Sequence, residues 1–324
     1  MKTIWLPLCL VVAFCGGPIR AATASQPAPS ASPWKQVFSD EFDGKDLDRT
    51  RWTTYEDCWG GGNQERQCYT TRPENVSVHD GQLDLTARFE KASGPSLPLD
   101  LRTPGVGTPP TSKPFTSGKV STLGAFSMTY GRIEVRARAP IGQGLWPAIW
   151  LLPEKNAYGP WPGSGEIDVM EAVNLGVNCA SCFGGRENNV YGTIHYGSNM
   201  HHQMQQKAVQ LAKGSEGDWH VSRVDWTPND ISWFVDDKAY YHVKLSNWRD
   251  TLQKGTTLAP ALKNAPFDRP FYPILNLAVG GLWPESHDQG GVALQNFPKT
   301  LAVDWVRVYE CEATRSGAGD CPSR

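Results

Sequence analysis

The sequence has no surplus of charge of either sign. Its 324 residues include 31 Lys and Arg against 33 Asp and Glu, which gives a formal net charge of −2. This balance supplies no electrostatic basis for binding nucleic acid or an anionic membrane surface. No apolar run long enough to span a membrane follows the N-terminal segment. The apolar spacing of amphipathic helices is also nearly absent, so the fold is expected to consist of strands.

Apolar residues, tryptophan, glycine and proline are plentiful. Apolar residues make up 40% of the chain, which is enough for a sizeable core and argues against global disorder. The 32 Gly and 25 Pro indicate many turns between short strands. Most of the 13 Trp are expected in the core. A surplus this large also suits a site that stacks on flat apolar faces, and the neutral charge favours sugar rings over bases.

The N-terminus is typical of a secretory signal. Lys2 precedes an apolar stretch over residues 4–14, and small residues ending in "AATA" follow. We expect residues 1–24 to be a signal peptide, cleaved after Ala22 or Ala24. A lipoprotein site at Cys15 is the alternative, but the bulky Phe14 stands where a small residue is expected. The mature protein is therefore expected to be secreted, periplasmic or extracellular, and without a membrane segment.

Cysteine usage agrees with export. Six cysteines remain after the signal, and an even number in an oxidising compartment indicates disulfides. Six cysteines allow 15 pairings. The motif "CASC" could also be a redox or zinc pair, but no second such pair accompanies it. Proximity in the sequence favours Cys58–Cys68, Cys179–Cys182 and Cys311–Cys321.

The rest of the chain predicts one all-β domain. Residues 25–33 form a Pro/Ser/Ala linker, and residues 34–324 form the domain. The stretches 75–88 and 231–245 alternate around short turns, which is typical of hairpins. Residues 90–114 are expected to be a long surface loop, and residues 246–254 a short helical turn. Many short strands at even spacing predict a β-sandwich or jelly roll.

The stretch "GSGEIDVMEAVN", residues 163–174, places three carboxylates in an apolar run. On a strand, Glu166 and Asp168 share a face because side chains alternate with period two. Glu171 would point to the other face. A β-bulge at Val169–Met170 adds one residue and returns Glu171 to the shared face. Bulges are frequent next to active sites, where they re-aim a side chain.

Two Glu on one strand face, flanking an Asp, form an arrangement suited to acid/base catalysis. A retaining glycosidase needs a nucleophilic carboxylate and a protonated acid about 5–5.5 Å apart. Neighbouring negative charges raise the pKa of one member and keep it protonated. Asp168 can hydrogen-bond Glu166 and hold its orientation. The alternatives are a solvated strand face and a calcium-binding edge.

The carboxylate stretch also belongs to a wider similarity. "EIDVME" resembles the signature of glycoside hydrolase family 16, in the bulged form typical of laminarinases. Other blocks resemble bacterial endo-β-1,3-glucanases in the same order. They are "DEFDG" (40–44), "GNQERQCYT" (62–70), "NVSVHDGQLDLTAR" (75–88), "YGRIEVRARAP" (130–140), "GLWPAIWLLP" (144–153), "VYGTIHYG" (190–197), "RPFYPILNLAVGG" (269–281) and "VDWVRVYE" (303–310).

This resemblance implies a β-jelly roll of two curved antiparallel sheets with a concave substrate groove. Glu166 matches the nucleophile of the family, Glu171 the general acid/base and Asp168 the assisting residue. The implied reaction is retaining endo-hydrolysis of β-1,3-glucosidic bonds in laminarin-like β-glucan by double displacement. It needs no cofactor for catalysis. The partner is the polysaccharide, and we expect a monomer.

Several other residues are expected to bind substrate. Trp146 and Trp150 have even spacing and can share one face of a strand, although one of them could pack in the core. The resemblance places this strand in the groove, where indole rings stack on glucose. Leu282 departs from the family, which usually has Asn there. The expected substrate-binding residues are Asn63, Arg132, Trp146, Trp150, Trp161, His195 and Trp283.

The resemblance also implies a structural Ca²⁺ on the convex side, away from catalysis. The matching ligands are Glu41, Asp304 and the Gly81 backbone carbonyl, and oxygen ligands suit this ion. The alternative is that these are ordinary surface carboxylates. Glu65 is expected to be structural. His201 and His202 are expected to be exposed, with no third ligand for a metal.

Three other functions remain possible on the same scaffold. Two of them are hydrolysis of mixed-linkage β-1,3-1,4-glucan and of an algal galactan, as in agarases and carrageenases. The bulged signature disfavours strict mixed-linkage and transglycosylase activity. The third is non-catalytic glucan recognition, which is disfavoured because such proteins lose the catalytic Glu, and both Glu166 and Glu171 are present here.

Overall fold

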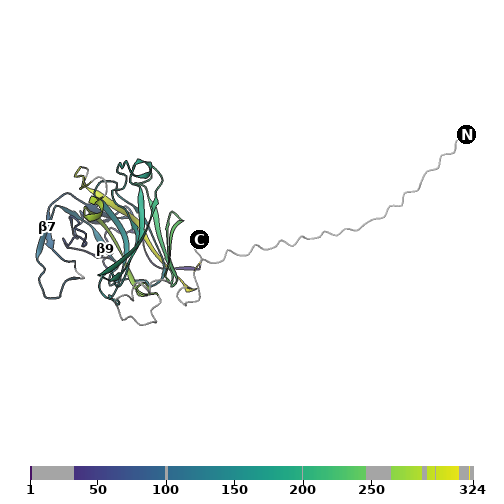
Figure 1. Ribbon diagram of the computed structural model, residues 1–324, viewed down its shortest axis with the longest axis horizontal. Helices are drawn as coiled ribbons and strands as arrows, with labels where there is room; N and C mark the ends of the chain where they lie inside the picture. Colours follow the sequence, from purple (N-terminus) through teal and green to yellow (C-terminus); the bar gives the residue numbers. More distant parts are fainter. Residues whose placement is uncertain are drawn as a thin grey trace. The chain divides into compact units, whose positions relative to one another are not determined.

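The alternating segments of the sequence form strands in two large antiparallel sheets (Figure 1). The computed structural model describes residue 1, residues 33–98, 101–198, 200–245, 264–286, 290–295 and 297–313, and Cys321. The described residues from Pro33 onward belong to one compact unit. The expected signal peptide, apart from residue 1, the linker up to residue 32, and the expected turn at 246–254 lie outside the described residues.

One sheet has eight strands. Neighbouring strands pair antiparallel throughout, and β1 pairs with β19 beside the main path. Its strands, in spatial order, are β17 (Lys238–Lys244), β16 (Asp230–Val235), β15 (His220–Trp226), β10 (Gly131–Arg138), β19 (Lys299–Cys311), β5 (Gln82–Ala87), β4 (Val76–His79) and the additional β1 (Trp34–Asp40).

The second sheet has seven strands and carries the carboxylate stretch. Its neighbouring strands also pair antiparallel. In spatial order they are β14 (His201–Gln210), β13 (Asn189–Ser198), β12 (Glu166–Glu171), β11 (Leu145–Pro153), β18 (Phe271–Val279), β9 (Lys119–Ser121) and β2 (Thr53–Thr54).

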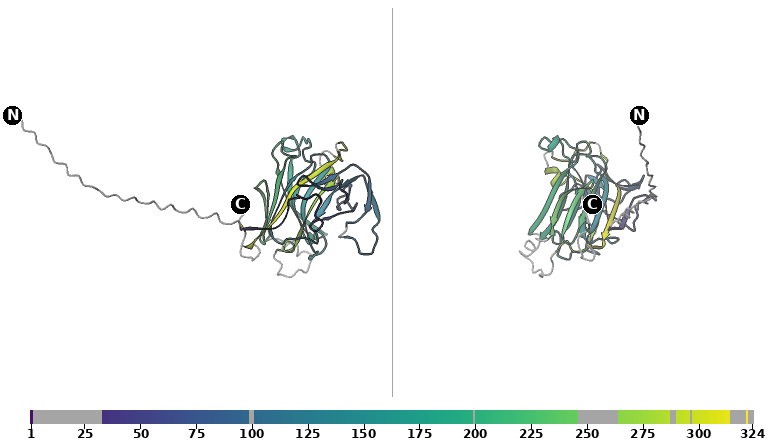
Figure 2. Two further views of the ribbon diagram at one scale, coloured as in Figure 1. Left: turned by 180° about the vertical axis from the view of Figure 1, so that it is seen from behind. Right: turned by 90° about the vertical axis from the view of Figure 1, so that its right-hand side faces the viewer.

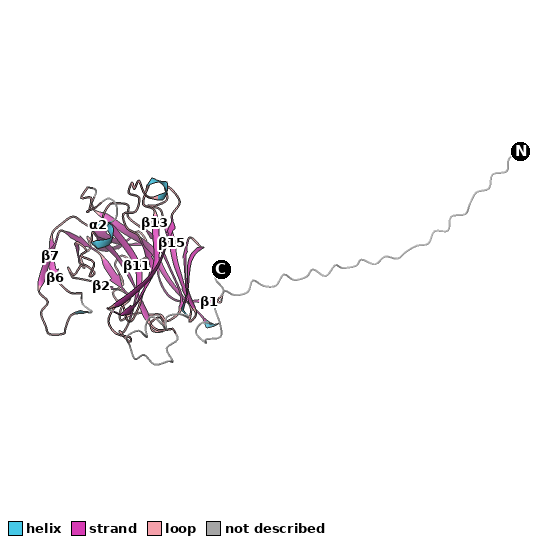
Figure 3. Ribbon diagram, viewed as in Figure 1, coloured by secondary structure: helices cyan, strands magenta, loops and turns pink. Residues whose placement is uncertain are grey.

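The core lies between these two sheets (Figure 2). Alternate residues of β10, Ile133 and Val135, are fully buried on one side of it. Ile149, Leu151 and Ile167 are fully buried from the seven-stranded sheet. Each such side chain contributes about 1.5–3 kcal/mol relative to an exposed one. The expected all-β jelly roll is confirmed, with strands making up nearly all regular structure (Figure 3).

The remaining elements are short. Two small sheets pair β3 (Gln67–Tyr69) with β8 (Phe115–Ser117), and β6 (Ala92–Pro95) with β7 (Pro110–Lys113). The 3₁₀ turn η2 (Phe183–Gly185) and the helix α2 (Leu282–Ser286) lie between strands. In the described part of the chain, no helix has the length and apolar character needed to cross a membrane.

The expectation that residues 90–114 form an irregular loop is wrong in part. Strands β6 and β7 pair antiparallel within this segment. The Cys58 backbone N–H donates to the Pro95 carbonyl at 2.7 Å, which ties the hairpin to the region of the Cys58–Cys68 disulfide. The pairing rests on backbone hydrogen bonds, which do not require alternating apolar side chains. A search for periodicity therefore could not find it.

The predicted hairpins are confirmed at both positions. Strands β4 and β5 flank Asp80 and Gly81, whose φ angles are 52° and 74°. Strands β16 and β17 flank Asp236 and Asp237, with φ angles of 47° and 62°. Two consecutive residues with positive φ are typical of the tight turns that match strand twist. All three predicted disulfides are also present: Cys58–Cys68, Cys179–Cys182 and Cys311–Cys321.

Candidate active site

Strand β12 contains the predicted β-bulge. Against β11, Asp168 pairs with Trp150 and Met170 pairs with Ile149, so Val169 is an extra residue without a partner. The register against β13 shifts over the same part of β12. The Nε1–H of Trp233, from the opposite sheet, donates to the Asp168 carbonyl at 2.7 Å. This bond satisfies a buried backbone acceptor beside the bulge.

The bulge determines which side chains face the core. Ile167, Val169 and Met170 all belong to the core cluster, although 169 and 170 are consecutive. Glu166, Asp168 and Glu171, which we call the three carboxylates, lie on the opposite face. A regular strand with period two would have sent Glu171 to the core side. The bulge is therefore what allows all three carboxylates to share one surface.

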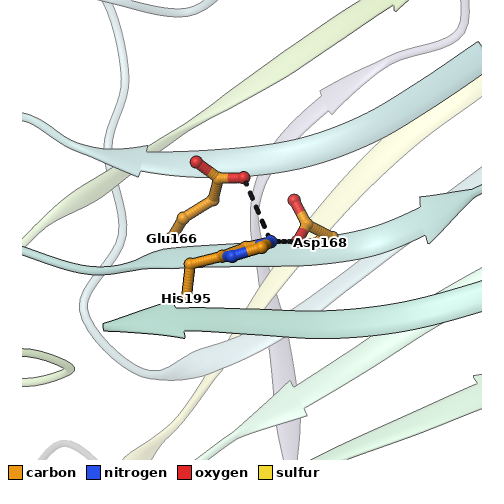
Figure 4. A group of neighbouring side chains, drawn as sticks. All are labelled: Glu166, Asp168 and His195. Atoms are coloured by element: carbon orange, nitrogen blue, oxygen red, sulfur yellow. Dashed lines mark ion pairs between the residues drawn. The ribbon is translucent and has the colours of Figure 1, made fainter. Parts of the chain in front are cut away.

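Glu166 is held between an indole and an imidazole. Trp161, on the connection from β11 to β12, donates a hydrogen bond from Nε1 to Oε2 of Glu166 at 2.7 Å. The Nε2 atom of His195 lies 3.8 Å from Oε1 of Glu166 and 3.4 Å from Oδ2 of Asp168. Figure 4 shows the His195 side chain extending from β13 toward the carboxylates of Glu166 and Asp168 on β12. His195 thus faces the carboxylates, as predicted.

Glu171 has a different set of partners. Trp146 donates from Nε1 to Oε1 of Glu171 at 2.9 Å. Thr193 donates from Oγ1 to Oε2 at 3.5 Å, and Oγ1 itself accepts a bond from Nε2 of Gln206 at 3.0 Å. Because an indole N–H can only donate, Oε1 of Glu171 must act as an acceptor. Both oxygens of Glu171 thus accept hydrogen bonds, and the bond from Trp146 is the shorter one.

Burial and mutual repulsion raise the pKa of each of the three carboxylates. Burial, followed by the Asp168 charge, raises the pKa of Glu166 to about 8. Burial and then the Glu166 charge raise the pKa of Glu171 to about 7. Burial and then the Glu171 charge raise the pKa of Asp168 well above its usual range. His195 opposes these effects at both Glu residues, since it favours their anions. The site therefore holds protons at neutral pH.

Trp146 and Trp150 lie on the same side of β11 as the carboxylates, because Leu145, Ile149 and Leu151, at the odd positions of the strand, face the core. Trp150 donates from Nε1 to Oδ1 of Asn276 at 2.6 Å, and Asn276 donates from Nδ2 to the Tyr69 hydroxyl at 3.0 Å. The Lys119 ammonium lies 5.1 Å from the Trp150 ring centroid. Both indoles are therefore fixed by hydrogen bonds at this face.

Trp283 extends the aromatic surface beyond Trp146. Their ring centroids are 5.3 Å apart in an edge-to-face arrangement, and the Tyr191 ring lies 5.0 Å from Trp283. The helix α2, which carries Trp283, is tied to Asn63 by a bond from the Leu282 backbone N–H to the Asn63 carbonyl at 2.8 Å. The Leu282 side chain, which stands where the family usually has Asn, is exposed.

Asn63 contacts a buried acid rather than a carboxylate of β12. Its Nδ2 donates to Oε1 of Glu65 at 3.4 Å. Glu65 is buried and accepts a second bond from Nε2 of Gln67 at 2.6 Å. Burial raises the pKa of Glu65, and these bonds oppose the shift. Glu65 has the structural surroundings expected of it, and substrate contact by Asn63 stays a prediction.

The structure corrects the prediction that Arg132 contacts substrate. Arg132 lies on β10 of the eight-stranded sheet, where its neighbour Ile133 faces the core. Its side chain therefore points away from the sheet that bears the carboxylates. It is buried and forms a bidentate pair with Asp225 at 2.7 and 2.8 Å, with its guanidinium 4.3 Å from the Trp34 ring. On this side of β10, Arg132 pairs with a residue of its own sheet and does not reach the face that bears the three carboxylates.

The expected calcium ligands face arginines. Arg307 donates two hydrogen bonds to Glu41, at 2.9 and 2.7 Å, and Arg136 donates to Asp304. Each of the two carboxylates is already neutralised by a guanidinium group. This arrangement does not favour a cation between them. The Gly81 carbonyl belongs to the tight turn after β4. Calcium binding at these residues stays a prediction, and no step of catalysis involves it.

His202 is exposed, as predicted, and it also contacts the site, which was not predicted. Its Nε2 lies 2.8 Å from Nδ1 of His195, and the two rings stack with centroids 5.1 Å apart. The Trp161 ring lies 4.9 Å from that of His202. In the β13–β14 hairpin, His202 pairs with Gly197, two residues from His195. The even spacing of His195 from Gly197, the partner of His202, places both histidines on the same face of the hairpin. This spacing is the signal that could have identified His202 as a site residue.

Among the described residues, one group of His, Cys, Asp and Glu side chains is tight enough to hold a metal. It consists of Glu166, Asp168 and His195, whose candidate ligand atoms lie within 4.8 Å of one another. Trp161 already donates to Glu166, and His195 carries a hydrogen bond at its other nitrogen. These contacts suit proton transfer and charge stabilisation, and we assign no metal to the group.

Comparisons with known proteins agree with this geometry. The family model of glycosyl hydrolases family 16 matches residues 63–306. A β-glucanase of Rhodothermus marinus is 38% identical over 290 residues, which cover 88% of each chain. A glucan endo-1,3-β-glucosidase A1 of Niallia circulans is 36% identical over 301 residues, covering 87% of this chain but 39% of that relative. The present chain thus spans well under half the length of the second protein.

The same similarity appears in three dimensions. The X-ray structure of the laminarinase from Rhodothermus marinus superposes with a TM-score of 0.67 at 37% sequence identity. The superposition covers 86% of this chain and 98% of the laminarinase.

Proposed function

The chain belongs to glycosyl hydrolase family 16, and we propose that it hydrolyses β-1,3-glucosidic bonds within laminarin-like β-glucan, with retention of configuration. It is a glycoside hydrolase. The observation that carries the proposed chemistry is the bulged strand β12, whose three carboxylates share one face. Two of them, Glu166 and Glu171, each accept a hydrogen bond from a different tryptophan. Family 16 glycosidases generally need no cofactor, and we expect none here.

In the first step, a carboxylate oxygen of Glu166 attacks the anomeric carbon of the sugar. The bond from this carbon to the glycosidic oxygen breaks, and Glu171 donates its proton to that oxygen. Burial keeps the Glu171 pKa at about 7, so the acid is protonated in mildly acidic solution. Glu166 must be ionised for this step, although burial and the Asp168 charge give it the higher pKa of the two, about 8, so the one proton that the pair retains must lie on Glu171 when the sugar is attacked. The Trp161 N–H and His195 both favour its anion against the effect of burial.

In the second step, the glycosyl–enzyme ester formed on Glu166 is hydrolysed. Glu171, now ionised, takes a proton from water, and the resulting nucleophile attacks the anomeric carbon from the face that the leaving group has vacated. The Glu166 carboxylate leaves and Glu171 recovers its proton. Two inversions at one carbon give net retention. Asp168, between the two Glu residues along β12, assists by holding Glu166 through a side-chain hydrogen bond.

The substrate proposal rests on the relatives and on the aromatic surface. A laminarinase and a glucan endo-1,3-β-glucosidase are among the similar proteins. Trp146, Trp150, Trp161 and Trp283 supply indole faces and N–H groups on the side of the carboxylates, which suits neutral glucose rings. The three disulfides agree with an extracellular or periplasmic protein, and we propose that the chain is secreted as a monomer.

A reducing-sugar and product-size assay on laminarin, lichenan, agarose and carrageenan tests this proposal. We expect rapid release of oligosaccharides from laminarin, with slower or no release from the others. Activity confined to agarose or carrageenan would replace the proposed substrate with a galactan. Binding to laminarin without hydrolysis would point to glucan recognition.

A further inference from the structure

We propose that His202 is a positioning residue that holds the His195 imidazole in the form whose Nε2–H faces Asp168. This inference rests on the proposed function, because the acids of that mechanism are the groups that His195 faces. It concerns a residue on β14 at the edge of the seven-stranded sheet, outside the segment that carries the carboxylates.

The contact between the two histidines fixes where protons can lie. Nδ1 of His195 and Nε2 of His202 are 2.8 Å apart, so one proton lies between them. A neutral imidazole has one N–H and one bare nitrogen. When His202 donates, Nδ1 of His195 is the acceptor, and the His195 proton must lie on Nε2. That nitrogen is 3.4 Å from Oδ2 of Asp168.

The reverse arrangement is unfavourable whenever the oxygens that face Nε2 of His195 are ionised, as the proposed first step requires of Glu166. If a neutral His195 donated from Nδ1, its bare Nε2 would face Asp168 and Glu166, and lone pairs would oppose lone pairs. Oδ2 of Asp168 is buried and accepts no hydrogen bond from the described residues. A buried acceptor without a donor is costly, so this oxygen favours an N–H from His195. Donation by His202 supplies that form.

The surroundings of His202 favour a neutral imidazole as the hydrogen-bond donor to His195. Burial and the neighbouring His195 lower the His202 pKa, so the ring is neutral near pH 7. The ionisable groups facing the pair are the three carboxylates of β12, all on the His195 side. The rings of Trp161 and His195 hold the His202 ring in place. His202 therefore acts on the carboxylates through His195 and does not contact them.

Two substitutions separate the hydrogen bond from the packing. His202→Phe keeps an aromatic ring beside Trp161 and His195 but has no donor. His202→Gln restores an N–H that can reach Nδ1 of His195. We expect H202F to lower kcat on laminarin roughly tenfold, the upper end for one hydrogen bond between neutral groups, with KM changed less than about twofold. H202Q should recover much of the lost kcat. His201→Phe, at the exposed neighbour, is the matched control and should retain wild-type kcat.

A spectroscopic readout tests the inference without relying on activity. In ¹⁵N-histidine-labelled protein above pH 8, where Glu166 is ionised, the wild-type His195 should show a bare Nδ1 and a protonated Nε2. In H202F this signature should be lost or mixed, and in H202Q it should return. An unchanged His195 signature in H202F, or a kcat within twofold of wild type, would overturn the inference. Failure of the wild type to hydrolyse laminarin would refute the proposed function, while the NMR result would still decide the role of His202.

Discussion

The Nε1 atom of Trp161 donates a 2.7 Å hydrogen bond to Oε2 of Glu166, from an indole whose ring is about half exposed. An exposed residue thus controls one of the two oxygens of the proposed nucleophile. The other oxygen, Oε1, faces His195. Glu166 is therefore oriented from two sides by groups that favour its anion.

Replacing Trp161 tests the importance of this bond. Trp161→Phe retains a ring for stacking but loses the N–H. We expect kcat/KM on laminarin to fall about 10- to 100-fold, the value of a hydrogen bond to a charged group. Steady-state kinetics measure the effect, with Trp219→Phe as control, since Trp219 packs on Arg136 of the other sheet. Equal losses in both variants would contradict a specific role for Trp161.

The raised pKa values of the acids predict the pH dependence of activity. The pKa of Glu171 is about 7 and that of Glu166 about 8, both well above the ordinary value of 4.5. Catalysis requires one proton on the pair, so activity should follow a bell with its basic limb near these values. Measuring kcat/KM from acid to alkaline pH checks this. A basic limb below pH 6 would show that the environment of β12 does not raise these values.

The same shifts predict that stability falls as the pH rises. Below the unfolded value of 4.5, Glu166 is protonated in both the folded and unfolded states and its burial carries no charge penalty. Above 4.5 the unfolded chain loses this proton first, so folding binds protons and stability declines until about pH 8. Glu166→Gln removes the titration. E166Q should raise Tm relative to wild type at pH 8 and change it little at pH 4. A gain in Tm that is the same at both pH values would contradict the assignment.

Arg132 is expected to matter for stability and not for binding. Arg132→Ala removes the bidentate partner of the buried Asp225, which costs at most about 3–5 kcal/mol of unfolding free energy, because Arg223 still lies 3.4 Å from Asp225. Urea unfolding measures this loss. The fraction that remains folded should keep the wild-type KM for laminarin. A raised KM with an unchanged free energy of unfolding would contradict this account and would indicate that Arg132 contacts the substrate.

Much of the site follows from local spacing. The bulge in β12 was predictable because a period of two cannot place Glu166 and Glu171 on one face without an extra residue. The even spacing of Trp146 and Trp150 predicted their shared side for the same reason. Tight turns at Asp80 and Asp236 also carry their own local signal.

The features that could not be predicted from the sequence depend on pairing between distant strands. Arg132 sits in a strand whose alternation is clear, but alternation does not reveal which sheet the strand joins. His202 reaches His195 only through the register of the β13–β14 hairpin. The hairpin of β6 and β7 is held by backbone hydrogen bonds between residues with no apolar pattern.

The central claim is that Glu166 forms a covalent bond to the sugar. A 2-deoxy-2-fluoro-β-laminaribioside with an activated leaving group should inactivate the enzyme, because fluorine slows both steps while the activated leaving group speeds only the first, so that the glycosyl–enzyme accumulates. Mass spectrometry of the digested protein is expected to find one glycosyl adduct, on Glu166, and none in the Glu166→Gln variant. An adduct on Glu171, or hydrolysis of laminarin with inversion and no adduct, would contradict the account.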